Sequence, residues 1–375
     1  MKSKVTKLSV LLVFVVLSGI IPQPNLCAQP DTALYRIVGR QYMDAGEYSK
    51  ALKAYTSLIK IDPISAKAYN FRGNAYTYLK KYDEAINDYT KAIALDSMFE
   101  KAYFNLANVF GKLKKYSEAL YDLSIVIKMD STYADAYRIR GITYIYLEKY
   151  NLGLKDLKTA ILFNPKDYLN WTFLGNVMLD MKDLKKSAEC FDTALKLQPT
   201  DTVAINNLLY CAQMSYHNKD YGEAVICYKS LINYQPFNKE LSVDLAGVFE
   251  DNNQIDSAKI ILENVLKYDP KCFSALAKIG EIYGKHLNDI NKSLKYLLSA
   301  YAIKDNDVSL LENIGVAYGI QKEFELSIKF LKKALALDPL NSSINSNLAN
   351  TYELSGDSKN ADKYFAIAKK ISNHK

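Results

Sequence analysis

Apolar and small side chains recur along this chain with a period of about 34 residues. If the first residue of each repeat is position 1, positions 4, 7, 8 and 11 are mostly apolar or small, and so are positions 20, 24 and 27. Within each set the spacing is that of one face of an α-helix. Each repeat is therefore predicted to be two helices joined by a polar turn. The ten repeats begin at Thr32, Ala66, Glu100, Ala134, Tyr168, Thr202, Lys239, Phe273, Val308 and Ser342.

Residue size within each repeat predicts how closely the two helices approach. Position 8 is glycine in six repeats: Gly39, Gly73, Gly141, Gly175, Gly280 and Gly315. Position 20 is alanine in six repeats: Ala51, Ala85, Ala119, Ala224, Ala258 and Ala361. Large residues such as Tyr55 and Phe191 follow at position 24. Small residues would allow close helix contact, and the large ones would fill the sides of the interface.

Prolines mark the repeat boundaries. The six that follow the first repeat's start are Pro63, Pro165, Pro199, Pro236, Pro270 and Pro339. Neighbours in this set are separated by close to one, two or three periods. Proline stops a helix, so each of these residues is placed where one repeat ends and the next begins. A single repeat cannot bury its apolar faces alone, and stacking of residues 29–371 into one all-α solenoid is expected. Residues 372–375 would form a short polar tail.

The pattern resembles the tetratricopeptide repeat (TPR), whose signature is W-x₂-L-G-x₂-Y, then A-x₃-F, then P. The segments at 171–175 (WTFLG) and 69–76 (YNFRGNAY) are close matches. The resemblance covers nearly all of residues 32–371. It implies a right-handed superhelical solenoid that binds protein segments in a concave groove, with no catalytic role.

Four departures from the pattern occur in repeats four, six and eight. Gly153 replaces alanine at position 20, and Leu209 replaces the small residue at position 8. The sixth repeat is longer, which predicts an extended loop at Ser215–Asp220. The eighth repeat gains one residue near His286–Asp289. The superhelix is expected to bend or present a loop in the sixth and eighth repeats.

The first 28 residues are typical of a secretory signal peptide. Three lysines precede an apolar run at Leu8–Ile21, which is shorter than the roughly 20 residues that span a bilayer. Cleavage after Ala28 would leave Gln29 first. The expectation is an exported protein, periplasmic or secreted, whose mature chain has no membrane span.

Two alternatives for the leader remain open. A lipoprotein signal could end at Cys27, although Leu26 is larger than the residue that usually precedes such a cysteine. An uncleaved membrane anchor is the other alternative.

Composition does not favour nucleic acid as a partner. The chain carries 48 Lys and Arg against 41 Asp and Glu, a net charge of +7. Without the three leader lysines the charge falls to +4, which is weakly basic for this length. The sequence therefore predicts protein binding rather than nucleic-acid binding.

Candidate chemistry is sparse. Four cysteines follow the leader, Cys190, Cys211, Cys227 and Cys272, and are interpreted as buried thiols, with a Cys190–Cys211 bond as the alternative. His217, His286 and His374 are interpreted as solvated histidines of turns and tail. They have no Cys or acid at ligand spacing, so no metal or cofactor is predicted. Most of the 30 tyrosines occupy packing positions.

Aspartate is followed by serine or threonine and then by a small or aliphatic residue at six places: Asp31, Asp96, Asp130, Asp192, Asp201 and Asp256. The pairs are similar to an O-glycosylation sequon of exported proteins in some Gram-negative bacteria. The same pairs suit the ends of helices and turns. Both interpretations stay open.

The candidate binding residues follow from the resemblance. In the TPR family, the groove is lined by positions 2, 5, 9, 12 and 13 of the first helix. In the first four repeats these positions, with Asn105 at position 6, supply basic, amide and aromatic residues, and the only acids are Asp44 and Asp135. The predicted groove residues are Arg36, Arg40, Lys67, Asn70, Asn74, Tyr78, Lys101, Asn105, Asn108, Arg138 and Tyr146.

The charged residues at the groove positions of repeats seven to ten are acidic, with Lys285 as the exception. They are Glu240, Glu250, Asp251, Glu281, Glu312 and Glu353. Separation of charge along one stripe favours an extended, charged ligand, and the basic end favours an acidic segment of a partner protein. An ordinary solvated surface is the alternative interpretation.

The leading functional hypothesis is a non-enzymatic scaffold of the cell envelope. One alternative is an assembly subunit of an envelope or secretion complex that docks through the convex face or the solenoid ends. A carbohydrate-related protein is the other, and it would need a catalytic domain or acid pair that the sequence does not show.

Overall fold

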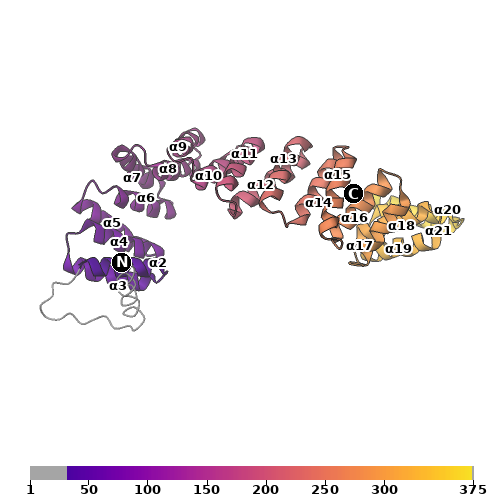
Figure 1. Cartoon of the computed structure of the whole chain (residues 1–375), viewed down its shortest axis with the longest axis horizontal. Coiled ribbons are helices and arrows are strands. Elements are labelled where there is room, and N and C mark those ends of the chain that lie inside the picture. Colours follow the sequence, from indigo (N-terminus) through magenta and orange to yellow (C-terminus); the bar gives the residue numbers. More distant parts are fainter. Residues whose placement is uncertain (1–31, 374–375) are drawn as a thin grey trace, which may run out of the picture. The chain divides into compact units, whose positions relative to one another are not determined.

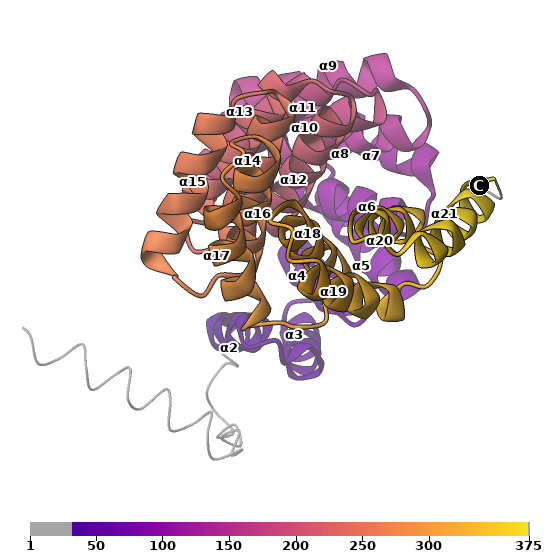
Figure 2. The same cartoon turned by 90° about the vertical axis from the view of Figure 1, so that its right-hand side faces the viewer.

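A computed structural model of the protein describes residues 32–373. Over this range the backbone forms twenty α-helices and no β-strand. The helices follow one another as pairs joined by short turns (Figure 1). They divide between two compact units, with the boundary between Pro165 and Lys166. Within the second unit, α18 to α21 form two neighbouring pairs (Figure 2).

The first unit contains α2 (Thr32–Asp44), α3 (Tyr48–Ile61), α4 (Ala66–Tyr78), α5 (Tyr82–Leu95), α6 (Glu100–Lys112), α7 (Tyr116–Met129), α8 (Ala134–Tyr146) and α9 (Tyr150–Phe163). The second unit contains α10 (Tyr168–Asp180), α11 (Leu184–Leu197), α12 (Thr202–His217), α13 (Tyr221–Tyr234), α14 (Lys239–Asp251), α15 (Ile255–Tyr268), α16 (Phe273–Lys285), α17 (Ile290–Tyr301), α18 (Val308–Ile320), α19 (Phe324–Leu337), α20 (Ser342–Leu354) and α21 (Ser358–Ser372). None of these helices is long and apolar enough to cross a bilayer.

The predicted all-α fold of ten helix pairs is confirmed. The first helices begin at the ten residues at which the repeats of the sequence begin. The turn inside most pairs contains a residue other than glycine with a positive φ, such as Lys80 at 60° and Lys182 at 62°. This left-handed residue ends the first helix within a turn of three residues.

Where position 8 is glycine, the two helices of the pair make close contact between position 8 and position 24. The large side chain lies where the glycine has no Cβ; at Gly175, a Cβ would lie only 2.7 Å from Cε1 of Phe191. The same arrangement occurs at Gly39 with Tyr55, Gly73 with Tyr89, Gly280 with Leu297 and Gly315 with Leu331. Alanines at position 20, such as Ala51 and Ala85, are fully buried. Small residues therefore set the distance between the two helices, as predicted.

The departure at Gly153 has a steric cause. A Cβ on Gly153 would overlap the end of the Ile145 side chain, and one on Gly141 would lie 3.0 Å from the carbonyl oxygen of Gly153. The fourth pair therefore places glycine on both helices, and Ile145 takes the space that an alanine would occupy.

The two predicted insertions have different structures. The prediction of an extended loop at Ser215–Asp220 is wrong, because α12 continues to His217 and only Asn218–Asp220 form the turn. Three added residues make nearly one helical turn, so Cys211, Ala212 and Ser215 all stay buried. In the eighth repeat the turn at His286–Asp289 has four residues, one more than the others, as predicted.

The four cysteines that follow the leader are free and buried, as predicted. Cys190, Cys211 and Cys227 lie in the core of the second unit. Burial raises the pKa of the Cys190 thiol to about 12 and also raises the pKa of Cys211 and Cys227. The alternative of a Cys190–Cys211 bond is therefore not adopted by the fold.

Three of the aspartates that precede Ser or Thr accept backbone hydrogen bonds. Asp201 caps α12 by accepting from the Val203 amide at 3.1 Å. Asp96 and Asp130 accept from the amides two residues later at 3.1 and 2.8 Å. These contacts give the aspartates a role at helix ends and leave the glycosylation hypothesis untested.

We expect the contact between Gly175 and Phe191 to resist enlargement. Gly175→Leu should lower the free energy of unfolding by about 1–3 kcal/mol or more, because the side chain would overlap the Phe191 ring. Urea unfolding followed by circular dichroism measures this change. Gly247→Ala is the control: no atom lies within 4 Å of the added Cβ, and helix propensity predicts a gain of up to about 1 kcal/mol. Unchanged stability of Gly175→Leu would contradict the proposed packing.

Candidate functional site

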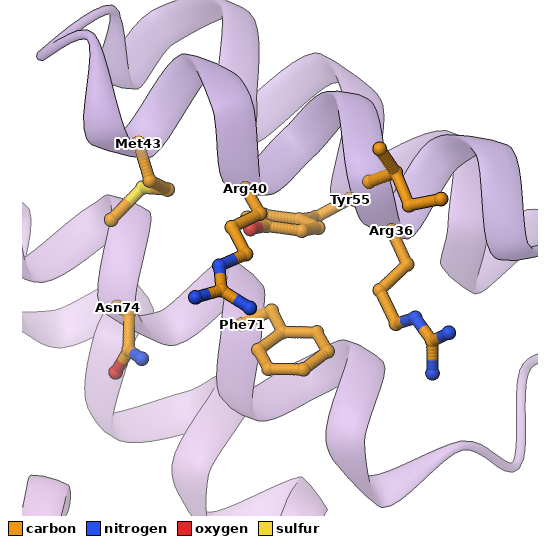
Figure 3. Close-up of a pocket in the computed structure, with 7 residues that line it drawn as sticks. Arg36, Arg40, Met43, Tyr55, Phe71 and Asn74 are labelled. Carbon is orange, nitrogen blue, oxygen red and sulfur yellow. The ribbon is translucent and has the colours of Figure 1, made fainter. Parts of the chain in front are cut away.

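A pocket of about 520 Å³ opens in the first two repeats of the first unit. Residues of α2, α3 and α4 line it (Figure 3). The lining residues are Arg36, Ile37, Arg40, Met43, Tyr55, Phe71 and Asn74. Three of them, Arg36, Arg40 and Asn74, are predicted groove residues. The structure therefore brings part of the predicted site together in a single concavity.

Aromatic side chains make the floor of this pocket. The Tyr55 and Phe71 rings lie 5.5 Å apart between centroids, and Tyr55 is only 3% exposed. Gly39 makes this placement possible, because a Cβ there would overlap the Tyr55 ring. Burial raises the pKa of Tyr55 to about 12, so the phenol stays neutral at physiological pH. The floor can hold an apolar or aromatic group.

Two arginines one helical turn apart make the rim. Arg36 has no ion-pair partner among residues 32–373. The Nε atom of Arg40 lies 3.9 Å from Asp44, but both side chains are more than 70% exposed. Exposed pairs of this kind contribute about 0–1 kcal/mol, so Asp44 leaves Arg40 available to a ligand. In Figure 3 both guanidinium groups reach beyond the floor of the pocket.

Asn74 is held by the neighbouring helix. Its Oδ1 accepts a hydrogen bond of 2.7 Å from the Tyr89 hydroxyl. Because the oxygen has a partner, the amide N–H groups remain to donate to a ligand. The pocket thus combines two cations, an amide donor and an apolar floor.

The other predicted asparagines and Arg138 make contacts within the fold. The Asn105 amide donates to Asn70 at 2.9 Å, and the Asn108 amide donates to the Phe104 carbonyl of its own helix. Arg138 lies 2.7 Å from Asp135 and is only 11% exposed. These residues lie on the predicted stripe, but part of their bonding capacity is used by the protein itself. Lys67 and Lys101 are exposed.

The two predicted groove tyrosines are exposed and stacked. Tyr78 lies parallel to Tyr48 with ring centroids 4.6 Å apart, and Tyr146 lies on Tyr116 at 5.6 Å. In both cases position 13 of one repeat meets position 17 of the preceding repeat. Sequence reasoning found Tyr78 and Tyr146 and missed their partners. The recurrence of tyrosine at these two positions is the signal that links them.

Four pocket residues were not predicted as site residues: Ile37, Met43, Tyr55 and Phe71. Their positions read as packing positions or were passed over for being apolar. Phe71 stands at position 6, where a polar side chain in other repeats crosses to the preceding one. Asn105 donates to Asn70, Asn207 donates to Asn176 at 2.8 Å, and Asn347 donates to Glu312 at 2.8 Å.

Two acids of the stripe in the second unit, Glu250 and Glu281, have cationic partners within the fold. Glu250, whose side chain is 2% exposed, lies 2.5 Å from Lys278, 2.8 Å from His286 and 3.5 Å from Lys285. His286 lies in the exposed turn, as predicted, but its ring also contacts Glu250, which the prediction of a solvated loop histidine did not include. Its turn follows α16 and folds back over α14, which sequence spacing alone does not show.

Glu240 and Glu312 also have partners in the next repeat. Glu240 accepts from the Ser274 hydroxyl at 2.8 Å, and Glu312 accepts from Ser343 and Asn347. The acids of the stripe therefore connect repeats. No group of three metal-ligating side chains occurs between residues 32 and 373.

Comparison with known proteins identifies the repeats. Models described as "TPR repeat" match residues 39–77 and 73–114, and the model of the "Tetratricopeptide repeat" matches residues 170–201 and 308–339. Four segments, which together make up less than half of the chain, are therefore similar to tetratricopeptide repeats. These TPR matches begin in the pocket region and recur in both compact units.

The chain is similar to parts of two longer proteins. It is 30% identical over 135 residues to BBSome complex member bbs-4 of Caenorhabditis elegans, which is 36% of this chain and 29% of that protein. It is 28% identical over 190 residues to BBSome complex member BBS4 of Bos taurus, which is 50% of this chain and 36% of that protein. The chain thus spans about a third of the length of these relatives.

Solved structures with similar folds include two TPR proteins. The C-terminal part of a TPR repeat-containing protein from Cytophaga hutchinsonii has a TM-score of 0.49 and 20% identity, covering 65% of this chain and 99% of that one. Yeast Tom70 has a TM-score of 0.41 and 15% identity, covering 91% of this chain and 92% of that one.

We expect Glu250 to stabilise the second unit in a pH-dependent way. Burial opposes its ionisation, but hydrogen bonds from Lys278 and His286 hold the pKa of Glu250 below its ordinary value. Its contribution is therefore present above the unfolded-state pKa, about 4.3, and is lost as pH falls through the lower folded-state pKa.

Glu250→Gln should lower the free energy of unfolding by about 1–3 kcal/mol at pH 7. The difference should vanish in strong acid, where the carboxyl of the parent protein is protonated. Urea unfolding at several pH values measures both. Glu353→Gln, at an exposed position, is the control and should stay within about 0.5 kcal/mol. A loss that persists unchanged in strong acid would refute this role of the Glu250 charge.

Proposed function

We propose that this TPR protein is a non-enzymatic interaction scaffold that binds an acidic, extended segment of a partner protein through the first four repeats. The observation that carries the proposal is the pocket of Arg36, Arg40, Asn74, Tyr55 and Phe71. It has a positive rim over an aromatic floor. A carboxylate could bind at the rim while a neighbouring apolar side chain enters the pocket.

The chemistry of the rim favours a carboxylate ligand. Guanidinium groups form paired, charge-assisted hydrogen bonds with carboxylates, and the Asn74 amide can donate to a peptide carbonyl. Exposed Lys67 and Lys101 extend the positive charge along the stripe. Each exposed ion pair contributes about 0–1 kcal/mol, so several must act together and binding should weaken as salt rises.

Export from the cytoplasm is the second part of the proposal. It is supported by the lysine-rich start, the short apolar run and the Ala28 end of residues 1–28, which lie outside the described residues. The cell-envelope setting of the scaffold, in the periplasm or outside the cell, depends on this leader.

An assembly subunit is the second candidate function. The curated relatives are named as members of a protein complex, the BBSome, and the similarity covers up to half of this chain. In that role the protein would dock through its convex face or its ends. The pocket arginines would then be dispensable for association, which separates the two candidates.

Intact-mass measurement of the native protein tests export. We expect a mature chain that begins at Gln29, because the apolar run is bounded by lysines before it and a small residue at the cut. A lipid adduct on Cys27 would support the lipoprotein alternative. A mass that retains residues 1–28 would refute cleavage.

Charge reversal at the rim tests the binding site. The probe is a fluorescent peptide of alternating glutamate and serine with one central phenylalanine, compared with the same peptide carrying glutamine for glutamate. We expect Arg36→Glu with Arg40→Glu to weaken binding of the acidic peptide at least tenfold in fluorescence anisotropy, with unchanged helicity. The glutamine peptide should bind weakly to both proteins.

Lys53→Glu with Lys91→Glu is the matched control. These exposed lysines lie on α3 and α5 of the same unit, outside the pocket, and the change in net charge is the same. Equal losses in the two double variants would show that only net charge matters. Undiminished binding in the rim variant would move the site elsewhere. Retained association of both variants with partners purified from envelope extract would favour the assembly-subunit role.

A further inference from the structure

The second and fourth repeats contain the same buried ion pair. Arg72 binds Asp88 through two hydrogen bonds of 2.7 and 2.6 Å, and Arg140 binds Asp156 through two of 2.7 and 3.0 Å. In both repeats the arginine is at position 7 and the aspartate at position 23. All four side chains are less than 20% exposed.

Aromatic rings flank the guanidinium in both pairs. The Arg72 guanidinium lies 5.5 Å from the Tyr69 ring centroid and 5.9 Å from that of Tyr76. The Arg140 guanidinium lies 5.5 and 6.0 Å from the rings at the same two positions, 4 and 11, of its own repeat. Cation–π attraction adds to the ion pair. The recurring unit is a carboxylate, a guanidinium and two rings.

The third repeat keeps this unit without its cation. Asp122 stands at position 23, and Tyr103 and Phe110 stand at positions 4 and 11, but position 7 is Leu106. Asp122 is only 6% exposed, and its Oδ2 has no hydrogen-bond partner within the described part of the chain. A buried carboxylate oxygen without a partner is unfavourable, so it is a candidate to receive an outside donor.

A surface depression of about 360 Å³ reaches Asp122. It is lined by Leu106, Phe110, Ser117, Glu118, Tyr121 and Asp122. Tyr121 is 69% exposed at its edge, and Glu118 adds a second negative charge. An outside group can therefore reach the carboxylate past an apolar and aromatic wall.

We infer that this depression binds an arginine side chain of a partner protein, whose guanidinium donates to Asp122 from the surface beside Leu106, as Arg72 and Arg140 donate to their aspartates from position 7. The neighbouring repeats show that a carboxylate at position 23 and rings at positions 4 and 11 accept this group. A guanidinium offers two parallel donors and a flat face for rings, whereas an ammonium offers neither. The site is negative and lies on α6 and α7, apart from the positive pocket of α2 to α4.

The ionisation of Asp122 agrees with an absent cation. Burial raises the pKa of Asp122 to about 7. The titratable groups near it are Tyr103 on α6 with Glu118 and Tyr121 on α7, and none of them is a cation. Arg140 of α8 reaches α7 at Ser124, but it is bound to Asp156. A bound guanidinium should bring the pKa of Asp122 down.

The test uses the full mature chain with N-acetyl-arginine amide as the probe. N-acetyl-citrulline amide, nearly the same shape without charge, is the reference ligand. We expect calorimetric titration at pH 8 to show binding of the arginine compound at least tenfold tighter than that of the citrulline compound. Carbon NMR of labelled aspartate should show the pKa of Asp122 fall when the arginine compound is present.

Two substitutions address the same atoms in opposite ways. Asp122→Asn removes the charge, and Leu106→Arg supplies the missing cation from within, so each should abolish the preference for arginine over citrulline. Leu106→Arg should also raise the melting temperature. Between about pH 4 and pH 7 the native state holds a proton on Asp122 that the unfolded chain has lost. The free energy of unfolding therefore falls as pH rises through this window. Asp122→Asn should remove that fall.

Two control variants keep the result specific. Glu118→Gln should retain most of the preference for arginine, because Glu118 is exposed and not the buried acceptor. Arg36→Glu with Arg40→Glu should leave it unchanged. Equal binding of the arginine and citrulline compounds by the parent protein would overturn the inference. So would a Leu106→Arg variant that folds and still prefers arginine; if it does not fold, Asp122→Asn decides alone.

Discussion

In six of the ten repeats, the close approach of the two helices depends on the absence of a side chain at position 8. Where the second helix carries a ring or leucine at position 24, that group fills the space left by the glycine. Each repeat is therefore a helix pair of fixed geometry, and neighbouring pairs bury the remaining apolar faces against one another. The direction of every groove-facing side chain follows from this contact, because it sets how each first helix is rotated against its partner.

Polar side chains on the first helices either bond to the preceding repeat or stay exposed, where a ligand could contact them. At position 6, asparagine or lysine crosses to the preceding repeat, as Asn105 does to Asn70 and Lys278 to Glu250. Such contacts occupy charged and amide groups that are predicted from the sequence to bind a ligand. In the first two repeats position 6 is Ile37 or Phe71 instead, and both side chains line the pocket. The exposed Arg36 and Arg40 thus stand beside an apolar floor.

Most of the fold could be predicted from the sequence, because one pattern of small and large residues recurs through the ten repeats. Its glycines, alanines and prolines can be recognised directly in the sequence. The candidate site was only partly predictable. Arg36, Arg40 and Asn74 were found by position, whereas Tyr55 and Phe71 were taken for packing residues although they form the floor. The contact of His286 with Glu250 was missed because the two residues are 36 apart in the sequence, so no local spacing signals the bond. The loop expected at Ser215–Asp220 was wrong because three residues can extend a helix without turning its faces.

The buried thiols of the second unit bear on how this protein would survive in an oxidising compartment. Thiolate rather than thiol is the species that reacts with oxidants and disulfides. Cys190, Cys211 and Cys227 are shielded from solvent and held in the thiol form by their raised pKa values, so the native protein is doubly protected. If the protein is exported as proposed, the newly translocated chain would have neither protection. Until the sixth repeat packs on its neighbours, a mispaired disulfide could form. Such a disulfide would prevent the helices from packing.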